Sequence, residues 1–196
     1  MPKRGKIPGT KMPEAEVTLR LALWLLDRSG PESYAEVAID GAHVKIRPHE
    51  QAGRRIEEQT VFDIRAFLQA NGCTPKSLKD EWRGTYTRKD CNLTISSVNG
   101  FDVRGKLGEK NIRAECKAGP LQSIKGISVR AILARAIGQV VTSEFASSAD
   151  DELWVAVPDT PAFESVGVKI VKGRLFAKTG IRLALVSEKG QVRLLN

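Results

Sequence analysis

Residue types that often carry chemistry are scarce in this chain of 196 residues. It holds three cysteines, Cys73, Cys91 and Cys116, and two histidines, His43 and His49. The cysteine count is odd, the spacing is wide, and no Cys-Xaa-Xaa-Cys pair occurs. These features argue against a zinc centre and against a disulfide framework. We therefore expect a reducing, cytoplasmic compartment.

Long apolar runs are also absent. The longest, Leu21 to Leu26, is far too short to cross a bilayer, and the basic N-terminus is not followed by the apolar segment of a signal peptide. No Gly-Xaa-Ser-Xaa-Gly or Gly-rich phosphate loop occurs, which leaves little for a serine hydrolase or a nucleotide-cofactor enzyme. A membrane partner is not expected.

Positive charge is what the chain has in excess. Its 31 Lys and Arg residues against 23 Asp and Glu give a net charge of +8. Clustered cations gain affinity for nucleic acid by releasing counterions, so we expect a polyanionic partner. A basic surface that meets an acidic protein is the alternative. The hydrophobic fraction of 41% is ordinary for a globular protein with its own core.

The N-terminal part is predicted to begin with a flexible basic arm, residues 1–12. An almost wholly apolar helix over 13–28 follows Pro13. Strands over 34–39 and 42–47 are then predicted to form a hairpin around Asp40-Gly41. We interpret residues 13–55 as an elaboration, built of this helix and hairpin, on a core of residues 56–196.

The core is predicted to open with a helix over 56–71, followed by a loop over 73–90 that mixes cations with Trp82 and Tyr86. Such mixing suits nucleic-acid contact, although a single Trp more often pins a loop to the core. Three antiparallel strands over 92–98, 101–107 and 111–117 are expected in a row.

The rest of the chain alternates helix and strand. Residues 128–143 carry the clearest helical stripe, and residues 153–158 form a continuous apolar strand typical of a central position. Residues 163–171 fit a helix or a strand. A final apolar strand is predicted over 181–187. The whole pattern indicates an α/β protein with a mixed sheet flanked by helices.

The residues with the most chemical potential lie on the second predicted hairpin. Asp102 stands near the start of its first strand, and Glu115 and Lys117 alternate with apolar residues on its second. Opposed residues of paired strands lie about 5 Å apart, so the two carboxylates can converge. They would supply oxygen ligands for Mg²⁺, and Lys117, on the same face, could hold a water or stabilise phosphate charge.

This Asp…Glu-Xaa-Lys arrangement, Phe101-Asp102 followed by Glu115-Cys116-Lys117, resembles the PD-(D/E)XK superfamily of restriction-endonuclease-like nucleases. Phe101 replaces the usual proline. The resemblance covers roughly residues 56–158 and implies an α-β-β-β-α-β core. It implies hydrolysis of DNA phosphodiesters with Mg²⁺ or Mn²⁺, and in many relatives a homodimer. The alternative is a non-catalytic basic nucleic-acid-binding protein in which these charges are only ion-paired.

The resemblance also implies auxiliary residues. Gln139, one turn from Arg135 on the helix after the motif, matches a position that often bears a Gln near the site. The family's first helix often donates a further Glu to the metal. Glu16 is our choice if that helix is 13–28, and Glu57 or Glu58 if it is 56–71. The carbonyl of the residue between Glu and Lys, Cys116, would be a third metal ligand beside Asp102 and Glu115.

Basic side chains outside the motif are predicted to hold the DNA backbone, which fixes position and affinity but not sequence. They come from the predicted hairpin and from the segment 73–90: Lys45, Arg47, Lys76, Lys79, Arg83, Arg88 and Lys89. A solvated cationic surface is the alternative for each of them.

Overall fold

The structure is a computed structural model, and it describes residues 11–41, 44–46, 49–51, 54–56, 59–97, 100–122, 128–143 and 150–195. The side chains of residues 45–60 are not part of that description. Most of the predicted basic arm, as well as Arg47, Glu57 and Glu58, lies outside the described residues, and so does the side chain of Lys45.

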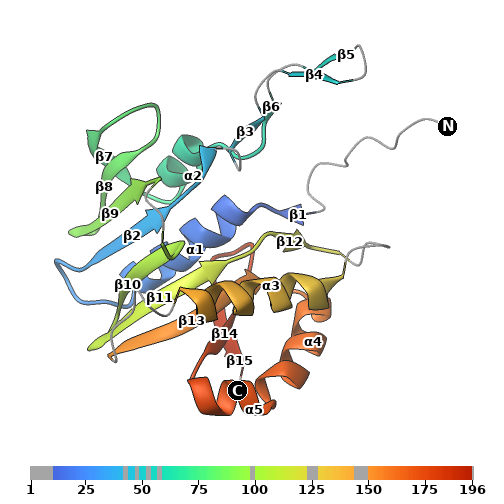
Figure 1. Cartoon of the computed structure of the whole chain (residues 1–196). Helices are drawn as coiled ribbons and strands as arrows, with labels where there is room; N and C mark the ends of the chain where they lie inside the picture. The colour runs from blue at the N-terminus through green and yellow to red at the C-terminus, as the bar shows by residue number, and fades with distance from the viewer. Residues whose placement is uncertain are drawn as a thin grey trace.

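The molecule is an α/β protein with a nine-stranded mixed sheet flanked by helices (Figure 1). The order across the sheet is β15-β14-β13-β11-β10-β2-β9-β8-β7. These strands are β2 (Tyr34–Ala38), β7 (Thr74–Leu78), β8 (Gly84–Arg88), β9 (Cys91–Ser96), β10 (Val103–Leu107), β11 (Lys110–Cys116), β13 (Asp151–Pro158), β14 (Arg182–Val186) and β15 (Val192–Leu195).

Five helices and three short ribbons complete the described chain. The helices are α1 (Glu14–Leu26), α2 (Ile64–Ala70), α3 (Val129–Thr142), α4 (Pro161–Val171) and α5 (Arg174–Thr179). The antiparallel ribbons pair β1 (Lys11–Met12) with β12 (Gly119–Pro120), β3 (Lys45–Ile46) with β6 (Gln59–Thr60), and β4 (His49–Gln51) with β5 (Arg54–Ile56). No described helix has the length and apolar character needed to cross a membrane.

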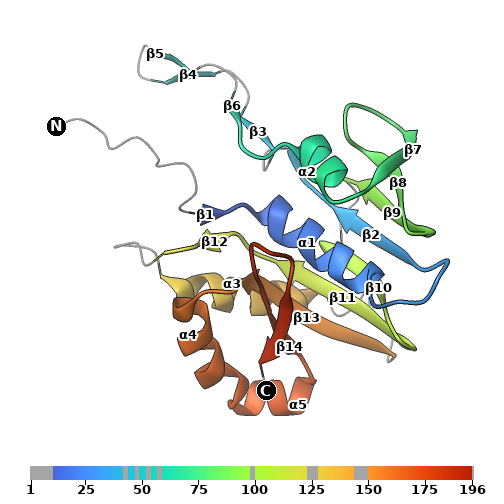
Figure 2. The same cartoon turned by 180° about the vertical axis from the view of Figure 1, so that it is seen from behind.

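Helix α1 covers one face of the sheet (Figure 2). The predicted apolar helix over 13–28 is confirmed. Ten of the 13 residues of α1 are buried, as its nearly continuous apolar sequence requires. It packs on the inward side chains of β2, β9, β10 and β11, and α2 joins the same apolar cluster through Ile64 and Leu68.

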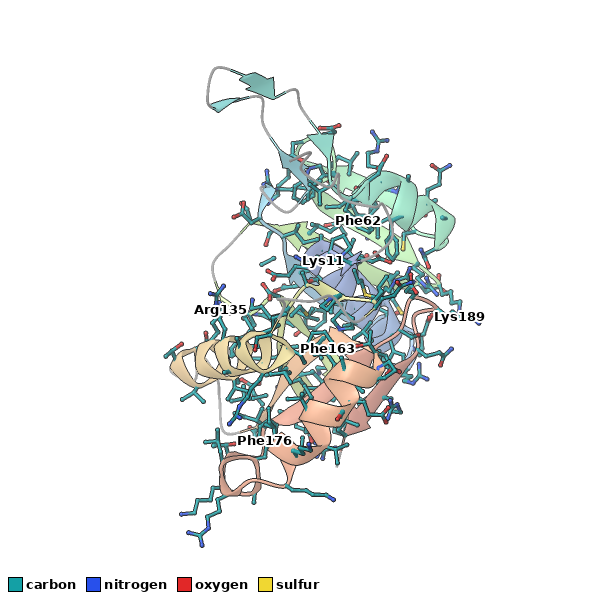
Figure 3. All side chains as sticks on the ribbon, turned by 90° about the vertical axis from the view of Figure 1, so that its right-hand side faces the viewer. Lys11, Phe62, Arg135, Phe163, Phe176 and Lys189 are labelled. Carbon is teal, nitrogen blue, oxygen red and sulfur yellow. The ribbon has the colours of Figure 1, made fainter. Side chains whose placement is uncertain are left out.

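Helices α3 and α4 cover the opposite face over β11, β13 and β14. The view in Figure 3 shows Phe163 inside this layer, where it is fully buried, and the exposed Arg135 at the upper edge of α3. The strand β13 lies between two parallel neighbours with helices on both sides, as its continuous apolar sequence predicts. The undecided segment 163–171 belongs to a helix, which Thr160 caps by accepting from the amide of Phe163.

The predicted pairing of strands is only partly correct. The hairpin of β10 and β11 is confirmed, but β9 does not pair with β10. Strand β2 lies between them, parallel to β9 and antiparallel to β10. The predicted hairpin of 34–39 with 42–47 is therefore wrong, because β3 pairs with β6 instead. Pairing between strands distant in sequence depends on the whole sheet, and a local turn signal does not specify it.

Two predicted elements differ in extent. The helix expected over 56–71 begins only at Ile64, where Asp63 accepts a hydrogen bond from the amide of Ala66, and strands occupy 54–56 and 59–60. The segment 73–90, expected as a loop, is the hairpin of β7 and β8. Strand β7 is exposed along its whole length, so its sequence does not alternate between apolar and polar residues and gives no strand signal.

The helix and strand that we interpreted as an N-terminal elaboration are part of the sheet's central core. β2 lies near the middle of the nine strands. Helix α1 packs across the sheet, where it contacts the strands from β9 to β14. The chain between β2 and β10 supplies α2 and the three strands β7, β8 and β9 at one end of the sheet.

Two helical glycines provide a test of this packing. A methyl group at Gly167 of α4 would meet side-chain carbons of Leu183 and Leu195 at 2.7 Å, whereas one at Gly138 of α3 would meet nothing within 4 Å. We expect Gly138→Ala to stabilise the protein by about 0.5–1 kcal/mol through helix propensity. Gly167→Ala should destabilise it by about 1–2 kcal/mol, since overpacking outweighs propensity. Thermal or urea unfolding measures both, and equal stabilisation by the two changes would contradict the packing of α4.

Candidate active site

The hairpin of β10 and β11 places Asp102 opposite Glu115. Val103 pairs with Ala114 in this antiparallel register, so the preceding and following residues face each other on one side of the sheet. The Asp102 carboxylate Oδ2 accepts a hydrogen bond of 2.7 Å from the Cys116 amide. The backbone carbonyl of Asp102 accepts from the amide of Ala38 on β2. The carboxylate is thus held in place from two strands.

Lys117 completes the cluster at the end of β11. Its ammonium Nζ donates to Glu115 Oε1 at 2.7 Å and lies 3.6 Å from Glu14 Oε2. Its backbone amide donates to the carbonyl of Ala156 on β13, which fixes the start of its side chain. All three side chains are largely buried, with 12%, 6% and 18% exposed for Lys117, Glu115 and Glu14.

The residue that α1 contributes is Glu14, which the sequence analysis missed. Glu16, our choice, instead forms an ion pair of 2.7 Å with Arg20 one turn further along α1. Residues two apart in a helix point about 200° apart, so only one of the two glutamates can face the sheet end. The pairing of Lys11 with Pro120 and of Met12 with Gly119 decides which, because it ties the start of α1 to the chain just after Lys117.

The cluster holds three carboxylates against one ammonium, and burial first, then the neighbouring charges, shift the pKa values of its groups. Burial and then the charge of Glu115 raise the pKa of Asp102 to about 7, against the hydrogen bond from Cys116 and the charge of Lys117. Burial also raises the pKa of Glu115, although its hydrogen bond with Lys117 opposes this. For Lys117 burial acts downward, but the hydrogen bond to Glu115 and the carboxylate charges outweigh it and leave its pKa raised.

A small hollow of about 50 Å³ adjoins the cluster, lined by acidic residues from three elements. Glu14 and Thr18 of α1 border it, with Asp40 after β2 and Asp102 before β10. A space of this size accommodates water-sized groups among polar partners. The hollow gives small polar species access to Asp102 from the side of α1.

These residues fit a hard divalent cation such as Mg²⁺. Such an ion usually takes one or two protein carboxylates and keeps water or phosphate oxygens for the rest of its shell. Asp102 and Glu115 supply that number, and because burial raises the pKa of both carboxyl groups, a bound cation would favour their charged forms. Across the described residues no group of three or more His, Cys, Asp and Glu side chains is arranged to hold a metal alone. A site here depends on solvent or substrate oxygens.

The predicted auxiliary residue Gln139 lies on α3. Gln139 is exposed on α3, and within the described chain its side chain forms no hydrogen bond with Asp102, Glu115 or Lys117. The helix itself packs on β11 and β13, as the pattern predicts, and both this residue and Arg135 are exposed on it.

Most of the cations predicted to bind nucleic acid have structural partners elsewhere. Arg88 and Lys89 both contact Asp27 at the C-terminus of α1, about 20 Å from the cluster at its N-terminus. Arg83 pairs with Asp80 and stacks on Trp82. Lys76 donates to Asn92, and the amide of Lys79 bonds to the carbonyl of Arg83 in the β7–β8 turn.

The aromatic residues of the same segment lie inside the molecule. Trp82 is 8% exposed, and Tyr86 is 2% exposed with its hydroxyl donating to the carbonyl of Trp82. The structure therefore supports the alternative that Trp82 fixes its loop to the core. Neither ring is available to stack on a base.

Comparison with known proteins finds no match to this chain among protein-family models, curated proteins or solved structures.

The raised pKa of Asp102 predicts how its removal affects stability. Between the ordinary carboxyl value of about 4 and about 7, the folded state retains a proton that the unfolded state loses, so stability falls as pH rises through this window. Asp102→Asn keeps an oxygen for the Cys116 amide and removes the charge. We expect it to stabilise the metal-free protein at about pH 8 by on the order of 1–3 kcal/mol. At about pH 3, below the ordinary value, the gain should nearly vanish. Thermal melts with EDTA test this, and a gain independent of pH would contradict it.

Proposed function

We propose that the protein is a metal-dependent deoxyribonuclease that hydrolyses DNA phosphodiester bonds. The observation that carries the proposal is the convergence of Asp102, Glu115 and Lys117 at one end of the β10–β11 hairpin, with a surplus of negative charge. Paired carboxylates next to an ammonium suit phosphodiester hydrolysis, because the carboxylates can hold a metal ion and the ammonium can position water or stabilise charge on the phosphate. The overall charge of +8 suits a polyanionic substrate.

The arrangement of elements supports a restriction-endonuclease-like core. The elements α1, β2, β10, β11, α3 and β13 follow one another in the order α-β-β-β-α-β once the insertion between β2 and β10 is set aside. The first three strands are antiparallel neighbours, and β13 returns parallel to β11 after α3. This core differs from the one that we expected, since its first helix is 14–26 and its first strand is β2.

The side chains divide the chemistry between them. Asp102, Glu115 and the carbonyl of Cys116 would hold Mg²⁺ or Mn²⁺, which supplies a polarised phosphoryl oxygen and a water of lowered pKa. Lys117 hydrogen-bonds the attacking water or stabilises negative charge that develops on the phosphate. Glu14 holds the Lys117 ammonium in position from the far side. Asp102 is fixed by the Cys116 amide, so the ligand set is oriented before substrate arrives.

Binding of a divalent metal ion tests the role of the two carboxylates. Mn²⁺ or Mg²⁺ should raise the melting temperature of the wild type, because binding to the folded state relieves the repulsion between Asp102 and Glu115. Glu115→Gln should lose at least about tenfold in Mn²⁺ affinity, whereas Glu188→Gln, an exposed carboxylate in a turn, should keep the response. Equal metal responses in the two variants would place the ion elsewhere.

Cleavage of DNA tests the role of Lys117. Wild-type protein with Mg²⁺ or Mn²⁺ should cut supercoiled plasmid or labelled single-stranded, duplex or branched DNA, and EDTA should stop it. Lys117→Ala should lower the rate at least about a hundredfold, since it removes the group beside the reacting phosphate. Lys110→Ala, at the other end of β11 and paired with Glu152, is the matched control and should cut normally. If wild type binds these DNAs and cuts none of them, the non-catalytic binding protein is the better description.

A further inference from the structure

The sheet has a face beside the candidate active site that the described helices leave uncovered. Side chains alternate along each strand, and those of β10, β2, β9 and β8 that point away from α1 are polar and solvent-accessible. Figure 1 looks onto this side, where α3 lies over β11 and β13 but not over these four strands. We name this surface the open face, and its main members are Tyr34, Glu36, Thr85, Thr94, Ser96 and Arg104.

The open face is continuous with the candidate active site. Strand pairing aligns Thr94, Glu36 and Arg104 in one row across the sheet. Asp102 lies two residues from Arg104 along the same strand direction, so its side chain points to the same face. A chain that leaves the cluster along β10 and β2 meets Arg104 first and Tyr34 about 13 Å away, four residues along the strands.

Arg104 has the surroundings of an anion-binding residue. Its direct cross-strand neighbour is another arginine, Arg113, and like charges in that position destabilise a sheet. Arg113 is compensated by an ion pair with Asp151. Within the described residues the Arg104 side chain forms no hydrogen bond or ion pair, although Glu36 is its direct cross-strand neighbour on β2. A guanidinium that no carboxylate holds at ion-pair distance can bind a phosphate through two N–H groups.

Open space surrounds the Arg104 side chain. Arg104 borders two hollows of about 180 and 220 Å³, one shared with Tyr34 and Glu36, the other with Ser96 and Phe101. Its guanidinium reaches back to Gly100, where a β-carbon would come within 2.7 Å of it. Gly100 has a φ of +137°, which only glycine adopts readily, so this position admits no side chain that would block Arg104.

Tyr34 provides an exposed aromatic ring on the same surface. It is 47% exposed, in contrast to the buried Trp82 and Tyr86. A ring on a flat sheet stacks on nucleotide bases of any sequence. Bases inside a duplex are stacked on one another and cannot reach such a ring, so a contact with Tyr34 requires an unpaired strand.

We propose that the open face binds an unpaired strand of nucleic acid that leads into the candidate active site, with a phosphate on Arg104 and a base on Tyr34. This inference rests on the proposed nuclease function for its direction, but its binding surface is testable without cleavage. Among the described residues, Glu36, the exposed Lys106 two residues along β10 from Arg104, and the Asp151–Arg113 pair carry the other charges on this part of the face. Glu36 opposes phosphate binding, and it supplies an acceptor for base amino groups.

The test is binding of a labelled oligodeoxynucleotide of about 12 residues to full-length protein in EDTA, single-stranded and as its duplex, at several salt concentrations. We expect the single strand to bind more tightly. Arg104→Ala should weaken it about tenfold or more and reduce the slope of log K against log salt by about 0.7, one phosphate contact. Tyr34→Leu should weaken it about fivefold or more with the slope unchanged. The control Arg174→Ala removes an exposed charge on α5 and should stay within about twofold.

Glu36→Gln is a control for misfolding. It removes a negative charge from the binding surface and should tighten binding about two- to threefold, a gain that a misfolded protein would not show. The inference is overturned if Arg104→Ala and Arg174→Ala behave alike, if Tyr34→Leu has no effect, or if the duplex binds better than the single strand. Failure of this surface is separable from failure of the nuclease proposal. If the protein cleaves DNA and neither Arg104 nor Tyr34 affects binding, only the proposal for the open face is rejected. If binding depends on Arg104 and no metal ion supports cleavage, only the nuclease proposal is rejected.

Discussion

The register of β10 against β11 is the constraint on which the rest of the site depends. It sets Asp102 opposite Glu115, and the hydrogen bond from the Cys116 amide to Asp102 holds it there. A slip of one residue would turn Glu115 and Lys117 toward the core beneath α1 and bring Ala114 and Cys116 to the outer face. The apolar residues of β11 forbid that slip, because they are fully buried in the main core. Packing of the core therefore positions the polar cluster.

The cluster is electrostatically costly, and the surrounding fold stabilises it. Asp102 and Glu115 are buried next to each other with raised pKa values, and Lys117 compensates only part of their charge. The ribbon of β1 and β12 brings Glu14 to the ammonium on its other side. Buried charged residues that lie together at the end of a sheet and lower the stability of the fold are expected at sites that bind charged ligands. A divalent cation and a phosphate are ligands whose opposite charges such a cluster can accommodate together.

The segment between β2 and β10 extends the sheet at one end. It adds α2 and strands β7, β8 and β9, so the sheet continues well past the part that α3 and α4 cover. One face of this extension packs on α1 and α2, and the other remains polar and open beside the cluster. The cations that looked most suitable in the sequence, Arg88 and Lys89, help to tie the extension to α1 through Asp27. The surface that reaches the cluster carries Arg104 and Tyr34 instead.

The sequence by itself determined the elements whose signals are local. The apolar α1, the stripe of α3, the continuous apolar β13 and the hairpin that joins Asp102 to Glu115 and Lys117 all follow from periodicity and short-range turns. Tertiary structure alone decided that β2 inserts between β9 and β10, because pairing of distant strands depends on the burial of the whole sheet. It also decided between Glu14 and Glu16. Both stand in the first turn of one helix, and only the β1–β12 pairing sets which of them faces Lys117.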